Sequence, residues 1–377
     1  MDPIAFIDLD AQRRRLGPRL EAAILGAVAE GHFILGPQVA EFEQRLARFG
    51  GAAHTVACAN GTDAIALSLM TLGVKPGDAV LVPSFTFAAT AEAVAWLGAT
   101  PVFVDVDEVT YTIDPAGLDA GLAAAAAAGL APRALIAVDL FGQPADYATL
   151  EVFCSRHGLT LLCDAAQSFG ASHCGRPVGS IGALTTTSFF PAKPLGCYGD
   201  GGAILTDDAD HAERLRSLHV HGRGSDKYDN VRIGMNSRLD TIQAVVLLEK
   251  LAIFPDEIER RQRVAERYAA GLQDVAAVPT VREGSRSVWA QYVIRVPAER
   301  RARFMADLKA EGIPTAIYYP LPLHRQTAYR RYPVAGNGLP VSDRIAAEAV
   351  ALPMHPYLDE AVQDRIVAAA RASLAAP

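Results

Sequence analysis

The chain has 377 residues, of which 50% are hydrophobic and 20% are charged, and its formal net charge is −7. This composition is typical of a globular protein, and the length exceeds that of one ordinary core, so we expect two domains. The negative charge excludes a general nucleic-acid binder, and it means that local groups must hold any anionic ligand.

Cysteine usage and hydropathy bear on the compartment. The five cysteines show no Cys-x-x-Cys or metal-ligand spacing, which is typical of reduced thiols; they are Cys58, Cys154, Cys163, Cys174 and Cys197. No apolar run reaches the about 18 residues of a membrane span. The segment from Met1 to Ile4 lacks the basic and apolar regions of a signal peptide. We therefore predict a cytoplasmic protein with no membrane partner and no metal site.

The N-terminal part is predicted to be helical up to a turn that suits phosphate. Residues 11–31 have helical spacing and stop at Gly31, and Pro37 fits the first turn of a second helix. Further on, Asn60-Gly61-Thr62 precedes another helical run. Glycine and threonine at a helix N-terminus offer free amides, a hydroxyl and the positive end of the helix dipole. The alternative for this turn is an ordinary N-cap.

From residue 79 onwards, strands and helices alternate. Strands are predicted at 79–83, 101–104, 134–139 and 160–164, and helices at 88–97, 115–128 and 147–157. Short apolar strands separated by helices indicate βαβ units and a buried, mostly parallel sheet. Ligands of such sheets bind at the carboxyl ends of the strands. Phe85, Phe87, Asp164 and Gln167 fall there.

Asp164 closes an apolar strand, so its carboxylate is expected to be buried and paired, because burying it alone costs several kcal/mol. One interpretation is that it caps a helix starting near Ala165. The other is that it pairs with a protonated ring nitrogen. The residues alone leave both interpretations open.

The segment around Lys193 has the features of a reactive site. A strand predicted at 184–190 leads into turns at Pro191 and Pro194, and a glycine cluster at 196–202 precedes a strand at 203–206. A lysine among these small and apolar neighbours would be partly desolvated, which lowers its pKa and frees the amine for Schiff-base chemistry. The alternative is a solvated loop lysine. The glycines are no dinucleotide fingerprint, because a strand and not a helix follows them.

A basic segment and a change of composition follow the glycine cluster. After a helix predicted at 210–219, an excess of basic residues either holds an anionic substrate or forms a solvated loop. These residues are His219, His221, Arg223, Lys227, Arg232 and Arg238. Helices are then predicted at 239–254 and on through Tyr268, at 301–311, 343–351 and 359–375, with strands at 291–296 and 314–319. We predict a large domain over residues 1–254 and a smaller α/β domain over 255–377.

A series of short motifs runs through the chain in a fixed order. They are Gly-His-Phe-Ile-Leu-Gly at 31–36, Ala-Asn-Gly-Thr-Asp-Ala at 59–64, Pro-Ser-Phe-Thr-Phe at 83–87, Asp-Ala-Ala-Gln-Ser at 164–168, Ser-Phe-Phe-Pro-Ala-Lys at 188–193, Gly-Asp-Gly-Gly-Ala at 199–203, Gly-Met-Asn-Ser-Arg-Leu-Asp at 234–240, Tyr-Pro-Leu-Pro-Leu-His at 319–324 and Leu-Pro-Met-His-Pro at 352–356. Together they resemble the aspartate-aminotransferase fold (fold type I) of pyridoxal-phosphate enzymes. More narrowly, they resemble the DegT/DnrJ/StrS family of nucleotide-sugar aminotransferases.

The resemblance implies a role for each motif residue around the cofactor ring. Lys193 would bind the cofactor covalently and then act as the general base and acid of the proton shift. Asp164 would keep the pyridine nitrogen protonated, Phe87 would stack on one ring face, and Gln167 would contact the ring near its phenolic oxygen.

The resemblance also implies how the cofactor phosphate is held. Gly61, Thr62 and Ser188 would bind it through amides and hydroxyls. Asn236 would reach it from a second subunit, so that the active site would be completed only in a homodimer.

The implied reaction is a transamination that passes through pyridoxamine phosphate. A subgroup of the family has histidine in place of the lysine and performs dehydration, whereas Lys193 is present here. The amino donor would be L-glutamate. The acceptor would be a nucleotide-linked keto sugar, and the motifs are most similar to those of enzymes acting on UDP-2-acetamido-2-deoxy-3-oxo-glucuronate, which supply bacterial surface polysaccharide such as O-antigen.

Four residues are candidates for substrate contacts. Arg238 would bind the sugar carboxylate, or equally the α-carboxylate of glutamate. Tyr318, Tyr319 and His324 would contact sugar hydroxyls, with plain packing as the alternative. Other interpretations of the whole chain are an aminotransferase for a dTDP- or GDP-linked 3- or 4-keto-6-deoxyhexose, and a pyridoxal-phosphate-binding regulator without turnover.

Overall fold

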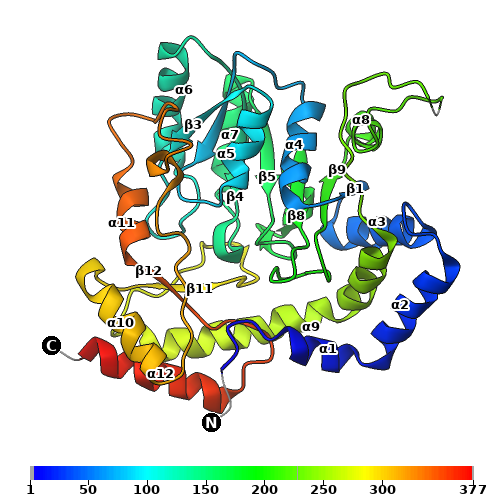
Figure 1. Ribbon diagram of the computed structural model, residues 1–377. Helices are drawn as coiled ribbons and strands as arrows, with labels where there is room; N and C mark the ends of the chain where they lie inside the picture. The colour runs from blue at the N-terminus through cyan, green and yellow to red at the C-terminus, as the bar shows by residue number, and fades with distance from the viewer. Residues whose placement is uncertain (1–3, 227, 376–377) are drawn as a thin grey trace.

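The computed structural model describes residues 4–226 and 228–375, and a seven-stranded sheet forms its centre (Figure 1). The strand order is β1-β9-β8-β5-β4-β2-β3. The strands are β1 (His54–Cys58), β2 (Asp78–Pro83), β3 (Thr100–Val104), β4 (Ala131–Val138), β5 (Thr160–Asp164), β8 (Leu184–Ser188) and β9 (Gly202–Thr206). Only β9 runs antiparallel to its neighbours in this sheet. The predicted mostly parallel sheet is thereby confirmed.

Helices cover the sheet, and most residues of its strands are buried. In β2, for example, every residue is buried, as is typical of strands with both faces covered. The helices of the first two thirds of the chain are α1 (Leu9–Leu16), α2 (Pro18–Glu30), α3 (Pro37–Gly50), α4 (Gly61–Thr71), α5 (Ala89–Trp96), α6 (Leu118–Ala127), α7 (Tyr147–His157) and α8 (Ala209–Leu218). None of the helices in the described part of the chain combines the length and apolarity needed to cross a membrane.

The C-terminal third builds a second, smaller core around an antiparallel pair. Its elements are the long helix α9 (Thr241–Leu272), β11 (Tyr292–Arg295), α10 (Ala298–Ala310), α11 (Pro340–Glu348), β12 (Ala349–Leu352) and α12 (Glu360–Ala375). Tyr268, Tyr292, Phe304 and Ile366 are buried together in this core. In Figure 1, α9 passes below the sheet and joins the α2–α3 end of the molecule to the C-terminal helices.

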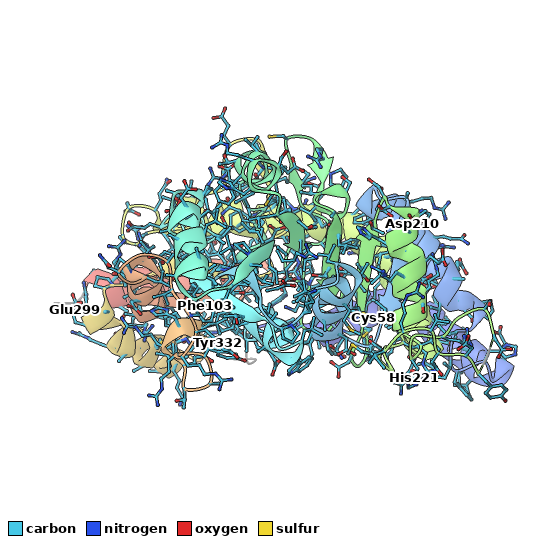
Figure 2. The ribbon with its side chains drawn as sticks, turned by 90° about the horizontal axis from the view of Figure 1, so that it is seen from above. Cys58, Phe103, Asp210, His221, Glu299 and Tyr332 are labelled. Atoms are coloured by element: carbon cyan, nitrogen blue, oxygen red, sulfur yellow. The ribbon has the colours of Figure 1, made fainter. Side chains whose placement is uncertain are left out.

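The central sheet and the C-terminal third are also joined by backbone hydrogen bonds at β3. The amide of Phe103 on β3 donates to the carbonyl of Pro333 at 3.0 Å, and Ala335 donates back to Phe103 at 2.8 Å. Figure 2 shows Phe103 and Tyr332 on these neighbouring segments. The division of the chain after residue 254 falls inside α9, and it stays a prediction.

The structure corrects two of the predicted helix boundaries. Residues 11–31 form two helices, because Gly17, with φ of 57°, turns the chain just before Pro18 starts α2. The two helices expected on either side of residue 254 are one, and Pro255 lies inside α9. A long buried face carries the helix past the proline, although the proline cannot donate a backbone hydrogen bond.

Two predictions in the C-terminal part were also wrong. Residues 314–319 form no strand: Ala316 makes a single bridge to Ala351, and prolines at 314 and 320 flank the segment without N–H groups to extend it. The helix expected at 343–351 ends at Glu348, because Ala349 to Leu352 pair with β11 instead.

Candidate active site

Three strands bring the predicted phosphate-binding residues together. Gly202 at the start of β9 pairs with Cys58 on one side and with Ser188 on the other. A Cβ atom on Gly61 would lie 2.7 Å from Cβ of Ser188, so the start of α4 and the end of β8 are in direct contact. Gly61 therefore allows an approach that any larger residue would prevent.

The N-terminus of α4 has free donors at this point. Oδ1 of Asn60 accepts from the amide of Asp63 at 2.8 Å, as in a regular N-cap. The amides of Gly61 and Thr62 have no acceptor among the described residues. Asn60 therefore caps the helix, and the two amides beyond it remain available to an anion, so phosphate binding at this turn stays a prediction.

Asp164 is 6% exposed at the carboxyl end of β5. Its Oδ1 accepts from the amide of Ala166 at 3.1 Å and from Oγ1 of Thr186 at 3.4 Å. A turn follows Asp164, so the alternative in which it caps a helix starting near Ala165 is wrong. Burial raises the pKa of this carboxyl, against the hydrogen bond from Ala166 and the positive charge of Lys193. The carboxylate can therefore still accept a hydrogen bond from a protonated ring nitrogen of a ligand.

Lys193 lies in the turn after β8 as a partly buried side chain. Burial lowers the pKa of its amine, and the neighbouring Asp164 opposes this effect. Within the described residues the amine has no hydrogen-bond or ion-pair partner. The predicted desolvated lysine beside a buried carboxylate is therefore what the fold provides, in place of a solvated loop lysine.

An aromatic group borders this pair. Phe87 is 55% exposed, and its ring centroid lies 6.0 Å from that of Tyr319. Gln167 accepts from the amide of Phe141 at 2.7 Å and donates to the hydroxyl of Tyr319 at 3.3 Å. Phe87 thus has an open ring face for stacking, and Gln167 links Tyr319 to the turn after Asp164.

His324 and Tyr318 contact other parts of the chain. Nδ1 of His324 lies 2.6 Å from Oγ of Ser84, and its Nε2 lies 3.4 Å from Asp343. Burial lowers the pKa of this imidazole, and Asp343 opposes the shift. The ring of Tyr318 packs against those of Phe6 and Tyr319. For His324 the geometry favours the packing alternative, since both ring nitrogens face side chains of the protein.

Asn236 and Arg238 lie in the basic segment and are held by its backbone. Asn236 forms a β-bridge to Val220, and its Oδ1 accepts from the guanidinium of Arg238. Oγ of Ser237, between them, accepts from the amide of Ala59 at 3.1 Å. Of the other basic residues of this segment, Lys227 lies outside the described residues. The basic segment is thus attached to the end of β1, just before the turn at Asn60-Gly61-Thr62 that is predicted to bind phosphate.

His219 was assigned to the basic segment, but it is a core residue. It is 5% exposed, and its Nδ1 lies 3.2 Å from the carbonyl oxygen of Ala57. Burial lowers its pKa to about 4. It cannot serve as a cation for a substrate at neutral pH.

We expect this histidine to destabilise the protein in acid. Below pH 6.5 the unfolded chain protonates it and the folded chain does not, so stability is lost as the pH falls from 6.5 towards about 4. Between pH 7.5 and pH 5 the wild type should lose about 2 kcal/mol more of its free energy of unfolding than His219→Asn. Urea unfolding of the apo-protein at both pH values measures this. Equal losses in the two proteins would contradict the assignment.

Several contacts of the site gave no sequence signal. The partners Thr186, Ser237 and Ser84 are ordinary polar residues, and each meets its partner across a long stretch of chain. Thr186 is the exception, because it belongs to a local run of three threonines in the mostly buried strand β8. The described residues contain no group of three or more His, Cys, Asp or Glu placed to bind a metal ion.

The assembled residues fit pyridoxal phosphate. Free amides at the start of α4 beside Ser188 suit its phosphate, an unpaired lysine suits its aldehyde, and a buried carboxylate suits its ring nitrogen. The spacing at Gly61 is too tight for any side chain, as expected where the backbone itself binds the ligand.

Comparison with known proteins agrees with this fit. The pattern of the DegT/DnrJ/EryC1/StrS aminotransferase family matches residues 16–371. A curated relative from Pseudomonas aeruginosa, UDP-2-acetamido-2-deoxy-3-oxo-D-glucuronate aminotransferase, is 46% identical over 95% of this chain and 97% of its own.

Solved structures show the same architecture. A DegT DnrJ EryC1 StrS aminotransferase from Brucella abortus superimposes with a TM-score of 0.97 at 55% identity, over 99% of this chain and 100% of that one. The protein NtdA from Bacillus subtilis, solved with bound cofactor PMP (pyridoxamine phosphate), gives a TM-score of 0.87 at 28% identity, over 99% of this chain and 86% of that one. The predicted fold type I and the pyridoxal-phosphate cofactor are confirmed. The chain belongs to the DegT/DnrJ/EryC1/StrS family of aminotransferases.

Proposed function

We propose that this enzyme transfers the amino group of L-glutamate to C3 of UDP-2-acetamido-2-deoxy-3-oxo-glucuronate, for bacterial surface polysaccharide. The observation that carries the proposal is the pair of Lys193 and Asp164 beside the phosphate turn at Gly61. The 46% identity to a relative with this named activity supports the choice of sugar.

The proposed roles follow from the geometry of the side chains. When bound, pyridoxal phosphate supplies a sink for the electron pair left on the donor carbon. Lys193, with its lowered pKa, would act as the base that takes the proton from that carbon and as the acid that returns it in the 1,3-proton shift. Asp164 would accept a hydrogen bond from the N–H of the cofactor ring and so keep the ring nitrogen protonated. Ser188, Gly61 and Thr62 would hold the phosphate, and Phe87 would cover one face of the ring. Gln167 donates to the hydroxyl of Tyr319 and would orient the site through it.

Arg238 is the proposed group for the sugar carboxylate. Among the described residues, its guanidinium donates to the amide oxygen of Asn236 and meets no carboxylate. A guanidinium with unused donors can grip a carboxylate in bidentate fashion. A 6-deoxy keto sugar has no such group, so the two kinds of acceptor differ in their need for Arg238.

We expect Arg238→Met to slow reaction with the UDP-linked 3-oxo-glucuronate by roughly 30-fold or more, because the substrate carboxylate loses its partner. Stopped-flow absorbance of the pyridoxamine form mixed with the sugar measures this. Arg223→Met, in the same segment with an exposed side chain, serves as the matched control. An unchanged sugar step together with slower reaction of glutamate would reassign Arg238 to the donor. Faster reaction with a dTDP- or GDP-linked 6-deoxy keto sugar would change the proposed acceptor.

The proposal includes a homodimer in which Asn236 of one subunit reaches the phosphate of the other. Large apolar side chains are exposed at the α2 side of the molecule and on the projecting segment that precedes α9, on the right in Figure 1. They are Leu25, Val28, Phe33, Ile34 and Leu35, together with Tyr228, Val231 and Ile233. Such a concentration of exposed apolar residues is typical of an interface. A second copy of the chain is its proposed partner.

We expect Ile233→Asp to convert the dimer into a monomer, since a carboxylate would replace an isoleucine that is 90% exposed on one chain. Light scattering coupled to size exclusion measures the mass. A titration with pyridoxal phosphate should also show weaker binding, because Asn236 would be lost from the site. Val109→Asp, at an exposed valine outside these segments, is the control. A dimeric Ile233→Asp protein would contradict the assignment.

We also propose a cytoplasmic location. All five cysteines are free, and four of them are buried, which suits a reducing compartment.

A further inference from the structure

Lys250 is a buried lysine that the site described above does not use. It lies on α9 with 1% of its surface exposed, and its Nζ donates to the carbonyl oxygen of Gly196 at 2.6 Å. Lysine is almost never fully buried unless its ammonium is paired. Burial lowers the pKa of Lys250 to about 8, while Glu257 on the same helix and the thiol of Cys197 oppose this effect. Burying this ammonium costs free energy, so the group that accepts its hydrogen bond indicates which segment Lys250 stabilises.

That acceptor belongs to the turn that carries Lys193. The amide of Lys193 donates to the carbonyl of Phe190 at 2.8 Å. Gly196 folds back onto the same backbone, since a Cβ atom there would lie 2.5 Å from the carbonyl oxygen of Pro191. Gly196 thus closes a turn against Pro191, and Lys193 lies within that turn. The hydrogen bond from Lys250 to Gly196 therefore restrains the turn that carries Lys193.

A second side chain of α9 holds the same turn. Gln243 precedes Lys250 by seven residues, which places both on one face of the helix. Its Oε1 accepts from the amide of Tyr198 at 2.8 Å, and its Nε2 donates to the carbonyl of Tyr198 at 3.3 Å. Nζ of Lys250 also lies 4.4 Å from the centroid of the Tyr198 ring. Gln243 thus holds the backbone of Tyr198, and Lys250 contacts the ring of the same residue.

We propose that Lys250 and Gln243 form a clamp on α9 that positions Lys193 for its reaction. Neither residue touches the reacting atoms, so both are positioning residues. Because α9 continues to Tyr268 in the C-terminal core, the clamp ties the reactive lysine to the helix shared by both parts of the chain. The inference rests on the proposed role of Lys193.

The test uses the holoenzyme and the variants Lys250→Met and Gln243→Leu, with Lys309→Met as control. Lys309 is an exposed lysine near the end of α10. Visible circular dichroism of the bound cofactor reports the orientation of the lysine that carries it. For Lys250→Met we expect the cofactor absorbance to persist, the visible dichroism to fall, and the half-reaction with L-glutamate to slow by about ten- to a hundredfold. Gln243→Leu should also lower the visible dichroism and the rate of the half-reaction, whereas Lys309→Met should change neither quantity.

A lower thermal midpoint with unchanged dichroism and rate in Lys250→Met would reduce the lysine to a packing role and overturn the clamp. If Lys250→Met does not fold, Gln243→Leu decides, since its side chain is only partly buried. Wild-type rate and dichroism in that variant would overturn the proposal. A wild type that gives no cofactor absorbance would instead refute the role of Lys193 itself, which separates the two failures.

Discussion

Lys193→Ala is expected to lose transamination almost completely, by about 10⁴-fold or more, because the variant lacks both the nucleophile and the proton carrier. The visible absorbance of lysine-bound pyridoxal phosphate should be absent, since no other lysine lies beside Asp164. The fold should be retained: the amine has no hydrogen-bond partner among the described residues, so its removal breaks no such contact. Single-turnover measurements with L-glutamate, together with an absorbance spectrum, test both expectations.

Lys309→Ala provides the control for this experiment, because it removes an exposed lysine of α10, in the C-terminal part of the chain. Its spectrum and rate should equal those of the wild type. A Lys193→Ala protein that keeps the visible band and turns over at more than a small fraction of the wild-type rate would show that another amine performs the chemistry.

Asp164→Asn is expected to slow the half-reaction by about 10²- to 10³-fold while leaving the cofactor bound, because the amide cannot keep the ring nitrogen protonated. The substitution keeps the shape and leaves an oxygen to accept from Ala166 and Thr186. The visible absorbance should persist, since Lys193 is intact.

The apo-form of the same variant gives a separate readout. Burial raises the pKa of Asp164 in the folded state, so the carboxyl stabilises the fold below its unfolded pKa and this contribution is lost as the pH rises. At pH 8 the apo-variant should therefore be at least as stable as the wild type. Asp210→Asn, on the outer helix α8 in Figure 2, is the control. A normal rate in Asp164→Asn would contradict the role of the carboxylate.

The sequence predicted those parts of the fold that depend on local signals. The strand ending at Asp164, the helix starting at Gly61 and the turn around Lys193 are marked by apolar runs, glycines and prolines, and the structure has each of them. Where an element depends on a pairing partner that is distant in the sequence, the prediction was wrong. Residues 314–319 were predicted to be a strand, but only Ala316 forms a bridge, to Ala351.

The supporting contacts of the site could not be read from the chain. Ser237 meets Ala59 across 178 residues, and His219 meets Ala57 across 162. Lys250 looks like one more helical lysine until the fold places it against Gly196. Such contacts depend on how β1, the Lys193 turn and α9 are brought together, and residue type at one position carries no information on that.

The central claim is that Lys193 and Asp164 support both halves of a transamination on this protein. The most direct measurement is the absorbance of the purified holoenzyme, first with L-glutamate and then with UDP-2-acetamido-2-deoxy-3-oxo-glucuronate. We predict that glutamate bleaches the visible band and that the sugar restores it. A band that glutamate leaves unchanged, or that fails to form with added pyridoxal phosphate, would contradict the account.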